Sequence, residues 1–321
     1  MRILLAGDHF VTNDLLAAAL RDRVEAEPVT LTLPWPHVPF GPVAEVDEAS
    51  GDEATLIAAL SGVDVAVTQM APFTARVLAA ADALKLVVVC RGGPVNVNLA
   101  AAEAAGIAVR TTPGRNAIAA AEHTIALILA ALRQIPDRHA GVRAGEWRSD
   151  LYALDRVGAE LAGSTVGLVG YGAIGRRVGR ILAAFGAEVL VHDPYAADVV
   201  GVDLAELLER STVVSLHARL TPETTGLIGA AELARLPAGA VLVNTARGGL
   251  LDYGAVVDAL ESGRLGAAAF DVFDAEPLPA DSRLRTAPRV VLTPHLAGAT
   301  RQTAERAAAL AADAVAAFVR S

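Results

Sequence analysis

The sequence contains one cysteine, Cys90, in 321 residues. A single thiol can form neither an intramolecular disulfide nor a cysteine-based metal site, so both are excluded and no metal is expected. Aromatic residues make up only 4% of the chain, and lysine occurs once, at Lys85. Arginine therefore supplies nearly all of the positive charge.

The chain also lacks an excess of basic residues. Lys and Arg number 27 against 36 Asp and Glu, which leaves a net charge of −9. A duplex-binding protein needs a basic face to release counterions, so this balance argues against a nucleic-acid partner.

No hydrophobic run is long enough to cross a bilayer. The most apolar stretch, residues 117–132, contains Glu122 and His123 and is too short. The first residues turn polar at Asp8, before a secretory hydrophobic region could be completed. We therefore expect a cytoplasmic protein with no membrane partner.

The composition that remains is globular, with 53% hydrophobic and 20% charged residues over a length that suits two domains. Short aliphatic runs alternate with alanine-rich stretches, which is typical of a parallel sheet covered by helices on both faces. The first series has predicted strands at 2–6, 29–33, 64–68, 86–90 and 107–111, and predicted helices at 15–23, 53–60, 74–82 and 99–105.

The pattern restarts after Gly163, which predicts two doubly wound α/β domains. A helix at 116–134, ended by Pro136, separates the two series, and a last helix covers 300–319. The proline-rich residues 34–42 predict an extended loop. The second series has predicted strands at 165–169, 188–191, 213–216, 241–244, 267–271 and 290–292.

A dinucleotide-binding motif opens the second series. Its first strand runs into a Gly-x-Gly-x-x-Gly sequence, Gly170-Tyr171-Gly172-Ala173-Ile174-Gly175, and a helix is predicted at 176–185. The first glycine permits the tight turn, the second lets the backbone approach a pyrophosphate, and the third allows close helix–strand packing. The amides between the last two glycines would point at the phosphates from a helix N-terminus.

An acid follows the next predicted strand. Asp193, after His192, lies 18 residues past Gly175, where a carboxylate can bind the hydroxyls of an adenosine ribose and repel a 2′-phosphate. The pattern therefore favours NAD over NADP. An ordinary glycine turn with a surface acid is the alternative. Arg176 and Arg177 either assist the pyrophosphate or lie on a solvated helix face.

Three polar side chains follow the last three predicted strands: Arg247, Glu276 and His295. Ligands of open α/β sheets bind beyond the carboxyl ends of strands, so these groups can converge on one cleft. Arginine offers a fork for a carboxylate, histidine is an acid or base suited to neutral pH, and a neighbouring carboxylate fixes its tautomer. Taken singly, each residue has a plainer interpretation, as a loop ion pair, a surface acid or a turn residue.

The chain closely resembles the D-isomer-specific 2-hydroxyacid dehydrogenases over nearly its whole length. The motifs that carry the resemblance are Gly170–Gly175 with Asp193, and the segments 217–224, 244–249, 271–277 and 294–295. The resemblance implies hydride transfer between NAD and a 2-hydroxy or 2-keto acid. His295 would donate or accept the proton, Glu276 would be its partner, and Arg247 would hold the substrate carboxylate and carbonyl.

The resemblance also implies the architecture. A Rossmann NAD-binding domain at 99–293 would be inserted in a flavodoxin-like substrate domain formed by 1–98 and 294–321, and the family suggests a homodimer through the NAD domain, around residues 147–161. Further cofactor-side residues would be His192, His217, Ala218, Arg219, Thr245, Ala246 and Asp271.

The sequence departs from the family in the loop that usually holds the substrate carboxylate. Arg91 replaces the usual first glycine, ahead of Gly92 and Gly93. Arg91 either binds a second anionic or polar group of the substrate or pairs with a nearby acid to stiffen the loop. Met70 either lines the substrate pocket or belongs to the core, and Arg219 stands where the family usually has proline.

Three rival functions remain. A formate dehydrogenase would pair its histidine with Gln, and Glu276 speaks against that branch. A Rossmann methyltransferase would leave the acid–base residues without a purpose. A non-catalytic NAD(H)-sensing regulator would keep the fold, and the intact set of three polar residues favours turnover instead.

Overall fold

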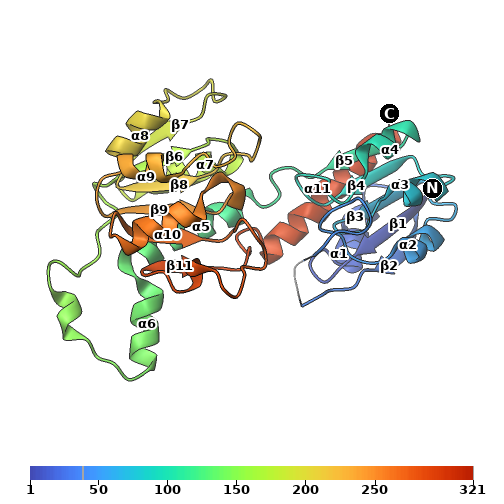
Figure 1. The fold of residues 1–321 in the computed structure, drawn as a ribbon. Helices are drawn as coiled ribbons and strands as arrows, with labels where there is room; N and C mark the ends of the chain where they lie inside the picture. Colours follow the sequence, from blue (N-terminus) through green and yellow to red (C-terminus); the bar gives the residue numbers. More distant parts are fainter. Residues whose placement is uncertain (38–39, 321) are drawn as a thin grey trace. The chain divides into compact units, whose positions relative to one another are not determined.

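The protein is described by a computed structural model that covers residues 1–37 and 40–320. The chain divides into two compact units (Figure 1). Each unit has hydrophobic clusters of its own. Unit 1 contains residues 1–116 and 299–321, and unit 2 contains residues 117–298. The second unit is thus inserted in the sequence of the first.

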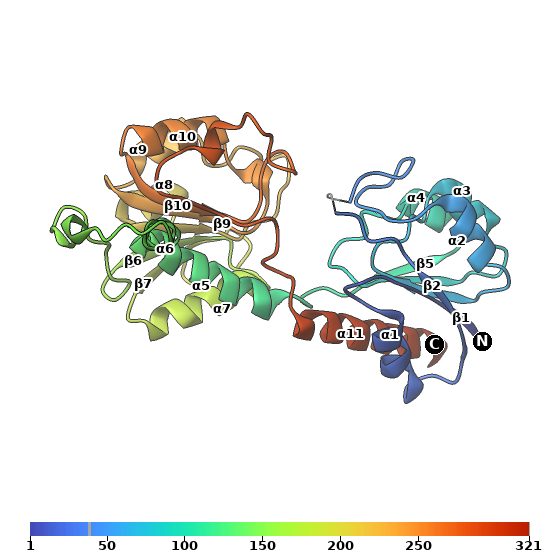
Figure 2. The same cartoon turned by 90° about the horizontal axis from the view of Figure 1, so that it is seen from below.

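Unit 1 is built on a five-stranded parallel sheet in the order β2-β1-β3-β4-β5, the flavodoxin-like order. Helices α1 and α11 cover one face, and α2, α3 and α4 cover the other (Figure 2). Burial on both faces explains why the central strands are apolar throughout. The elements are β1 (Arg2–Gly7), α1 (Asn13–Arg21), β2 (Glu27–Thr32), α2 (Glu53–Ala59), β3 (Val65–Thr68), α3 (Ala75–Ala80), β4 (Leu86–Val89), α4 (Leu99–Ala104), β5 (Ala108–Thr111) and α11 (Arg301–Arg320).

Unit 2 has a six-stranded parallel sheet in the order β11-β10-β9-β8-β6-β7. Helices α5 and α7 pack on one face, and α8, α9 and α10 pack on the other. The elements are α5 (Ala117–Arg133), α6 (Ile135–Arg143), η1 (Ser149–Tyr152), β6 (Thr165–Val169), α7 (Ala173–Ala184), β7 (Glu188–His192), α8 (Leu204–Arg210), β8 (Val213–Leu216), α9 (Ala230–Arg235), β9 (Ala240–Asn244), η2 (Gly248–Leu250), α10 (Tyr253–Glu261), β10 (Leu265–Phe270), η3 (Arg283–Arg285) and β11 (Val290–Leu292).

The strand order of unit 2 reverses between β6 and β8, because β7 lies on the other side of β6. Ligands of such sheets bind at this switch point, beyond the carboxyl ends of the strands. The glycine motif follows β6 and His217 follows β8, so both stand at the switch point.

The predicted strands and the two doubly wound α/β domains are confirmed, with strand ends shifted by at most two residues. The domain boundary expected at residue 98 is wrong. Strand β5 pairs with β4 and completes the first sheet, so residues 99–116 belong to unit 1. At the other end, unit 2 extends to residue 298 instead of 293.

The long helix expected at 116–134 ends at Arg133, where Gln134 takes a left-handed conformation with φ 49° before α6 begins. In the proline-rich loop, residues 34–37 and 40–42 form neither helix nor strand, and Val38 and Pro39 lie outside the described residues. No single described helix has the length and hydropathy to cross a membrane. Helices α5 and α6 meet that test only together, as a pair bent by 65°.

Candidate functional site

The glycine loop between β6 and α7 has the close backbone packing that its sequence predicts. Gly170 has φ +96°, and a Cβ there would lie 2.5 Å from the amide nitrogen of Ala218. A Cβ on Gly175 would lie 2.4 Å from the carbonyl oxygen of Gly170. A Cβ on Gly172 would instead meet no atom within 4 Å. The second glycine therefore faces open space, as a backbone that receives a pyrophosphate must.

Asp193, directly after β7, is tied to this loop. Its Oδ2 accepts a hydrogen bond of 2.6 Å from the amide of Tyr171, and its Oδ1 accepts one of 2.9 Å from the amide of Tyr195. His192 lies beside them, where its carbonyl accepts from the Gly170 amide at 2.8 Å. The carboxylate stands at the first turn of the loop, where the ribose of a bound dinucleotide is expected.

The segment after β8 forms the other side of the switch point. Burial lowers the pKa of His217 to about 4, so its imidazole is neutral at neutral pH. Its Nε2 lies 3.0 Å from Oγ of Ser215. Ala218 contacts the glycine loop through its backbone, whereas Arg219 is exposed.

His295 and Glu276 form the pair that the sequence predicts. His295 Nδ1 lies 2.7 Å from Glu276 Oε2, and Glu276 Oε1 accepts from the amide of Phe273 at 2.9 Å. The hydrogen bond to Glu276 raises the pKa of His295. Burial raises the pKa of Glu276, but the hydrogen bonds from His295 and Phe273 outweigh it and leave that pKa below its usual value. The pair favours an imidazolium beside a carboxylate.

Asp271 positions the segment that carries His295. Its fully buried carboxylate accepts hydrogen bonds from the Thr293 hydroxyl at 2.6 Å, the Leu296 amide at 2.8 Å and the Ala297 amide at 2.7 Å. Burial raises the pKa of Asp271, but these bonds and the one from His123 keep it below the usual value. The ionised carboxylate thus holds the backbone on the far side of His295, which itself has φ +55°.

Arg247 is exposed in the loop after β9, and its guanidinium donates to the carbonyl of Ala246 at 2.6 Å. Asn244 shapes this loop, because its amide donates to the Arg247 carbonyl at 2.8 Å. A Cβ on Gly248 would lie only 1.9 Å from the carbonyl oxygen of Phe273, so this loop packs against the one that carries Glu276. Arg247 is close enough to lower the pKa of His295.

Thr245 is buried in the same loop, and its Oγ1 lies 2.7 Å from that of Thr124 on α5.

The contacts among these loops bring Arg247, Glu276 and His295 together beyond the carboxyl ends of the strands of unit 2.

The expected substrate-side residues lie in unit 1. Arg91 forms an ion pair with Glu48, and its Nη1 lies 3.4 Å from Sδ of Met70. Of the two interpretations of Arg91, the structure shows the ion pair with a nearby acid. A Cβ on Gly93 would meet no atom within 4 Å, and one on Gly92 would meet only the Cα of Pro113, at 4.0 Å, which leaves this backbone approachable.

Sequence reasoning missed several supporting residues. His123 on α5 lies 3.1 Å from Oγ1 of Thr293 and 3.5 Å from Oδ1 of Asp271, behind the His295 segment. The one sequence feature that could have identified His123 is its polar side chain inside an otherwise apolar helix. No sequence pattern identifies Glu48 as the partner of Arg91. In residues 1–37 and 40–320, no cluster of three or more His, Cys, Asp or Glu is placed to hold a metal ion.

A family model described as D-isomer specific 2-hydroxyacid dehydrogenase, NAD binding domain, matches residues 125–297. D-3-phosphoglycerate dehydrogenase of Mycobacterium leprae is 42% identical over 285 residues, 86% of this chain and 53% of that protein. Glyoxylate reductase of Aeropyrum pernix is 40% identical over 253 residues, 76% of each chain. The chain thus spans about half the length of the phosphoglycerate dehydrogenases that it matches.

Solved structures are similar over all of this chain, and two of them illustrate the match. TT0316 protein from Thermus thermophilus has a TM-score of 0.81 with 34% identity, and 97% of it is covered. NAD-dependent formate dehydrogenase from Staphylococcus aureus, in complex with NAD, has a TM-score of 0.78 with 29% identity, and 95% of it is covered. From these matches, the chain belongs to the D-isomer specific 2-hydroxyacid dehydrogenase family, and unit 2 carries its NAD-binding domain.

Proposed function

We propose that the protein is an NAD-dependent oxidoreductase that interconverts a 2-hydroxy acid and its 2-keto acid. The single observation that carries the proposal is the 2.7 Å pair of His295 and Glu276 in the domain that binds NAD. An imidazole with a raised pKa beside a carboxylate is a proton donor for a carbonyl that is being reduced.

Bound NAD would supply or accept the hydride at C2 of the substrate. In the reductive direction, His295 donates the proton from Nε2 to the carbonyl oxygen, because Nδ1 is held by Glu276. Glu276 retains the negative charge and stabilises the imidazolium before the transfer. In the oxidative direction the neutral imidazole accepts the hydroxyl proton.

Arg247 supplies the positive charge for the substrate. A guanidinium fork binds a carboxylate through two parallel hydrogen bonds, and it also polarises the adjacent carbonyl. The side chain is exposed, and its hydrogen bond to the Ala246 carbonyl uses only Nη1. Nη2 can therefore donate to the substrate carboxylate.

The residues that would hold NAD are those of the glycine loop and Asp193. The open space at Gly172 fits the pyrophosphate, and the carboxylate beside Tyr171 fits the two hydroxyls of the adenosine ribose. A 2′-phosphate there would be repelled by Asp193.

We propose that the substrate carries one carboxylate and an uncharged side chain. The charge of Arg91 is already matched by Glu48, so a second anion would have to displace that acid. Kinetics of Arg91→Ala on short and long 2-keto acids, with and without a distal carboxylate, test this. A selective loss of the dianionic substrates would instead make Arg91 their anchor.

Turnover distinguishes the enzyme from a non-catalytic NAD(H)-sensing regulator. The test is NADH oxidation, followed by absorbance, with glyoxylate, hydroxypyruvate and longer 2-keto acids. The proposal requires turnover with at least one of them and its loss in His295→Ala. Binding of NADH without turnover on any 2-keto acid would favour the regulator.

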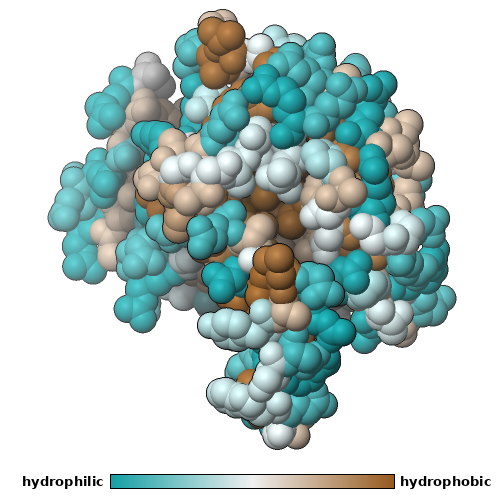
Figure 3. All heavy atoms as spheres, turned by 90° about the vertical axis from the view of Figure 1, so that its left-hand side faces the viewer, coloured by the Kyte–Doolittle hydropathy of each residue, from teal (hydrophilic) through white to brown (hydrophobic). Residues whose placement is uncertain are grey.

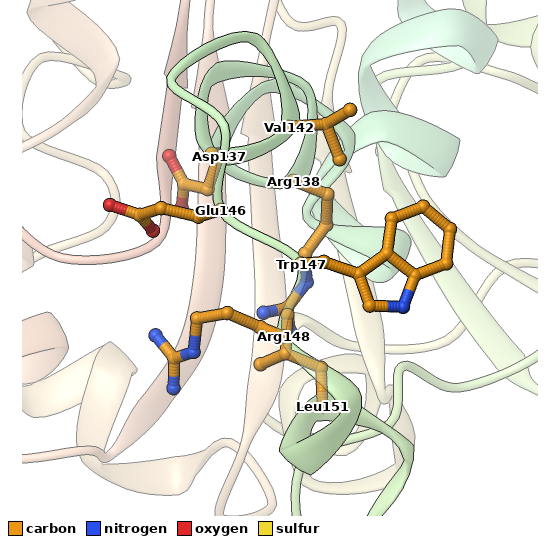
Figure 4. Close-up of a pocket in the computed structure, with 8 residues that line it drawn as sticks. Asp137, Arg138, Val142, Glu146, Trp147, Arg148 and Leu151 are labelled. Carbon is orange, nitrogen blue, oxygen red and sulfur yellow. The ribbon is translucent and has the colours of Figure 1, made fainter.

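We propose that the protein forms a homodimer through the arm of unit 2, defined as residues 135–161. Trp147, Tyr152 and Leu154 on this arm are 86%, 92% and 93% exposed. Figure 3 shows apolar residues among polar ones on the side of the molecule that bears the arm. Trp147 also helps to line a cavity of about 270 Å³ on this arm, together with Val142 and Leu151 (Figure 4).

Light scattering after size exclusion tests the dimer. Leu154→Asp should shift the protein toward the monomer, whereas Val200→Asp, at an equally exposed position off the arm, should not. A wild-type monomer would contradict the proposal.

We also propose a cytoplasmic location, which suits the single buried, unpaired thiol of Cys90. Cell fractionation tests this location.

A further inference from the structure

A second arginine–carboxylate pair lies at the dinucleotide loop. Arg176 is in the first turn of α7, and its Nη1 and Nη2 lie 2.6 Å and 2.5 Å from the two carboxylate oxygens of Asp198. The guanidinium also lies over the ring of Tyr171, 4.9 Å from its centroid. Both donors of the guanidinium fork that face Asp198 are thus occupied by one carboxylate.

This pair is next to the carboxylate that fits the ribose. The amide of Tyr171 donates to Asp193, and Asp193 is an electrostatic neighbour of Arg176. The segment 193–198 therefore folds back on the glycine loop and places two acids and one arginine together. The net charge of these three groups is −1.

An arginine in this position has the chemistry to bind a 2′-phosphate, because a guanidinium fork matches phosphate oxygens as well as carboxylate oxygens. Asp198 occupies that fork. A 2′-phosphate would have to displace Asp198 and bring its negative charge close to Asp193. A ribose hydroxyl carries no charge, can donate a hydrogen bond to Asp193 and leaves Asp198 in place.

We propose that Asp198 is a second determinant of coenzyme selectivity, which excludes the 2′-phosphate of NADP by keeping Arg176 engaged. This inference rests on the proposed function, since it assumes that the ribose of a dinucleotide lies at Asp193. Asp198 acts as a positioning residue through Arg176, and Arg176 is a latent phosphate ligand.

The test is calorimetric binding of two coenzyme fragments, ADP and 2′,5′-ADP, without any turnover. Asp198→Ala frees the guanidinium and should improve the affinity for 2′,5′-ADP relative to ADP by about tenfold, the effect of one hydrogen bond to a charged group. Asp198→Glu, which can still reach Arg176, should restore the wild-type ratio.

Two controls isolate the mechanism. Arg176→Gln combined with Asp198→Ala should cancel the gain, because the phosphate ligand is then absent. Glu209→Ala removes one acid from another exposed ion pair of unit 2, with Arg235 at 2.8 Å, and should leave the ratio unchanged. An equal gain in the affinity of Glu209→Ala for 2′,5′-ADP relative to ADP would mean that the effect comes from the net charge of the protein, and it would overturn the proposal.

The outcomes also separate this inference from the proposed function. If the wild type binds ADP and Asp198→Ala leaves the ratio unchanged, the role of Asp198 is wrong and the proposed function stands. If the double variant Arg176→Gln with Asp198→Ala still shows the gain for 2′,5′-ADP, the role of Asp198 is likewise wrong and the proposed function stands. If neither the wild type nor any variant binds ADP or NADH, the proposed function fails and this inference fails with it.

Discussion

Replacing Glu276 by Gln tests whether the carboxylate sets the protonation of His295. Gln keeps the shape of the side chain and can still accept the hydrogen bond from the Phe273 amide, but it carries no charge. Because the hydrogen bond that His295 donates to Glu276 raises the pKa of His295, the substitution should lower that pKa. Reduction, which needs the protonated imidazole, should then fade at a lower pH.

The magnitude follows from the geometry. The atoms are 2.7 Å apart, but the two side chains are 49% and 31% exposed, so solvent screens the interaction. A hydrogen bond to a charged group contributes about 1.5–3 kcal/mol when buried, and an exposed ion pair contributes about 0.2–1 kcal/mol. An intermediate value of about 1.4 kcal/mol corresponds to a tenfold change in the protonation equilibrium.

The assay is the initial rate of NADH oxidation, with saturating 2-keto acid, across the pH range. At a pH above the alkaline limb of both proteins, Glu276→Gln should reduce about tenfold more slowly than the wild type. Well below both limbs, His295 is protonated in each protein, so the change in its pKa should not alter the rate of reduction. Oxidation needs the neutral imidazole, so its acid limb should also move to lower pH. At a pH below both acid limbs, Glu276→Gln should therefore oxidise the 2-hydroxy acid faster than the wild type.

Asp274→Asn is the matched control, since it removes a negative charge from the same loop without touching His295. An alkaline limb that stays in place in Glu276→Gln would refute the role of the pair. A shift of the same size in the control would assign the effect to the general potential of the loop.

Three further substitutions test the rest of the site. His295→Ala should lower turnover by roughly 10²–10⁴ with NADH binding retained, and comparable turnover would remove His295 from its role. Gly170→Ala should weaken NADH binding and lower the melting temperature, because its Cβ would lie 2.5 Å from the Ala218 amide nitrogen at φ +96°; wild-type values would refute the packing. Asp271→Ala leaves the Ala297 amide without its acceptor and should cost about 3 kcal/mol in urea unfolding; a loss below about 1 kcal/mol would contradict its positioning role.

The predictions that succeeded depend on signals that are local in the sequence. An apolar run bounded by turn residues identifies a strand such as β6, and the glycine spacing identifies the loop after it. Chain order then places Asp193 after the next strand. These features are fixed by backbone sterics and by burial on both faces of a parallel sheet, which act within a few residues.

The predictions that failed depend on which segments the sheet brings together. The boundary at residue 98 was wrong because strand 108–111 resembles any other strand, and only its pairing with β4 assigns it to unit 1. The role of Asp271 was incomplete for the same reason. Its sequence position gives no indication that its carboxylate binds the Leu296 and Ala297 amides, 25 and 26 residues away.

The sequence by itself therefore determined the two parallel α/β sheets, the glycine loop after β6 and the pairing of His295 with Glu276. Only the tertiary structure decided that Glu48 engages Arg91 and that Asp198 engages Arg176. Both ion pairs join segments that are apart in the sequence, and the approach of these segments follows from the packing of whole strands and helices. The energy of such a pair depends on that approach, and no pattern within either segment encodes it.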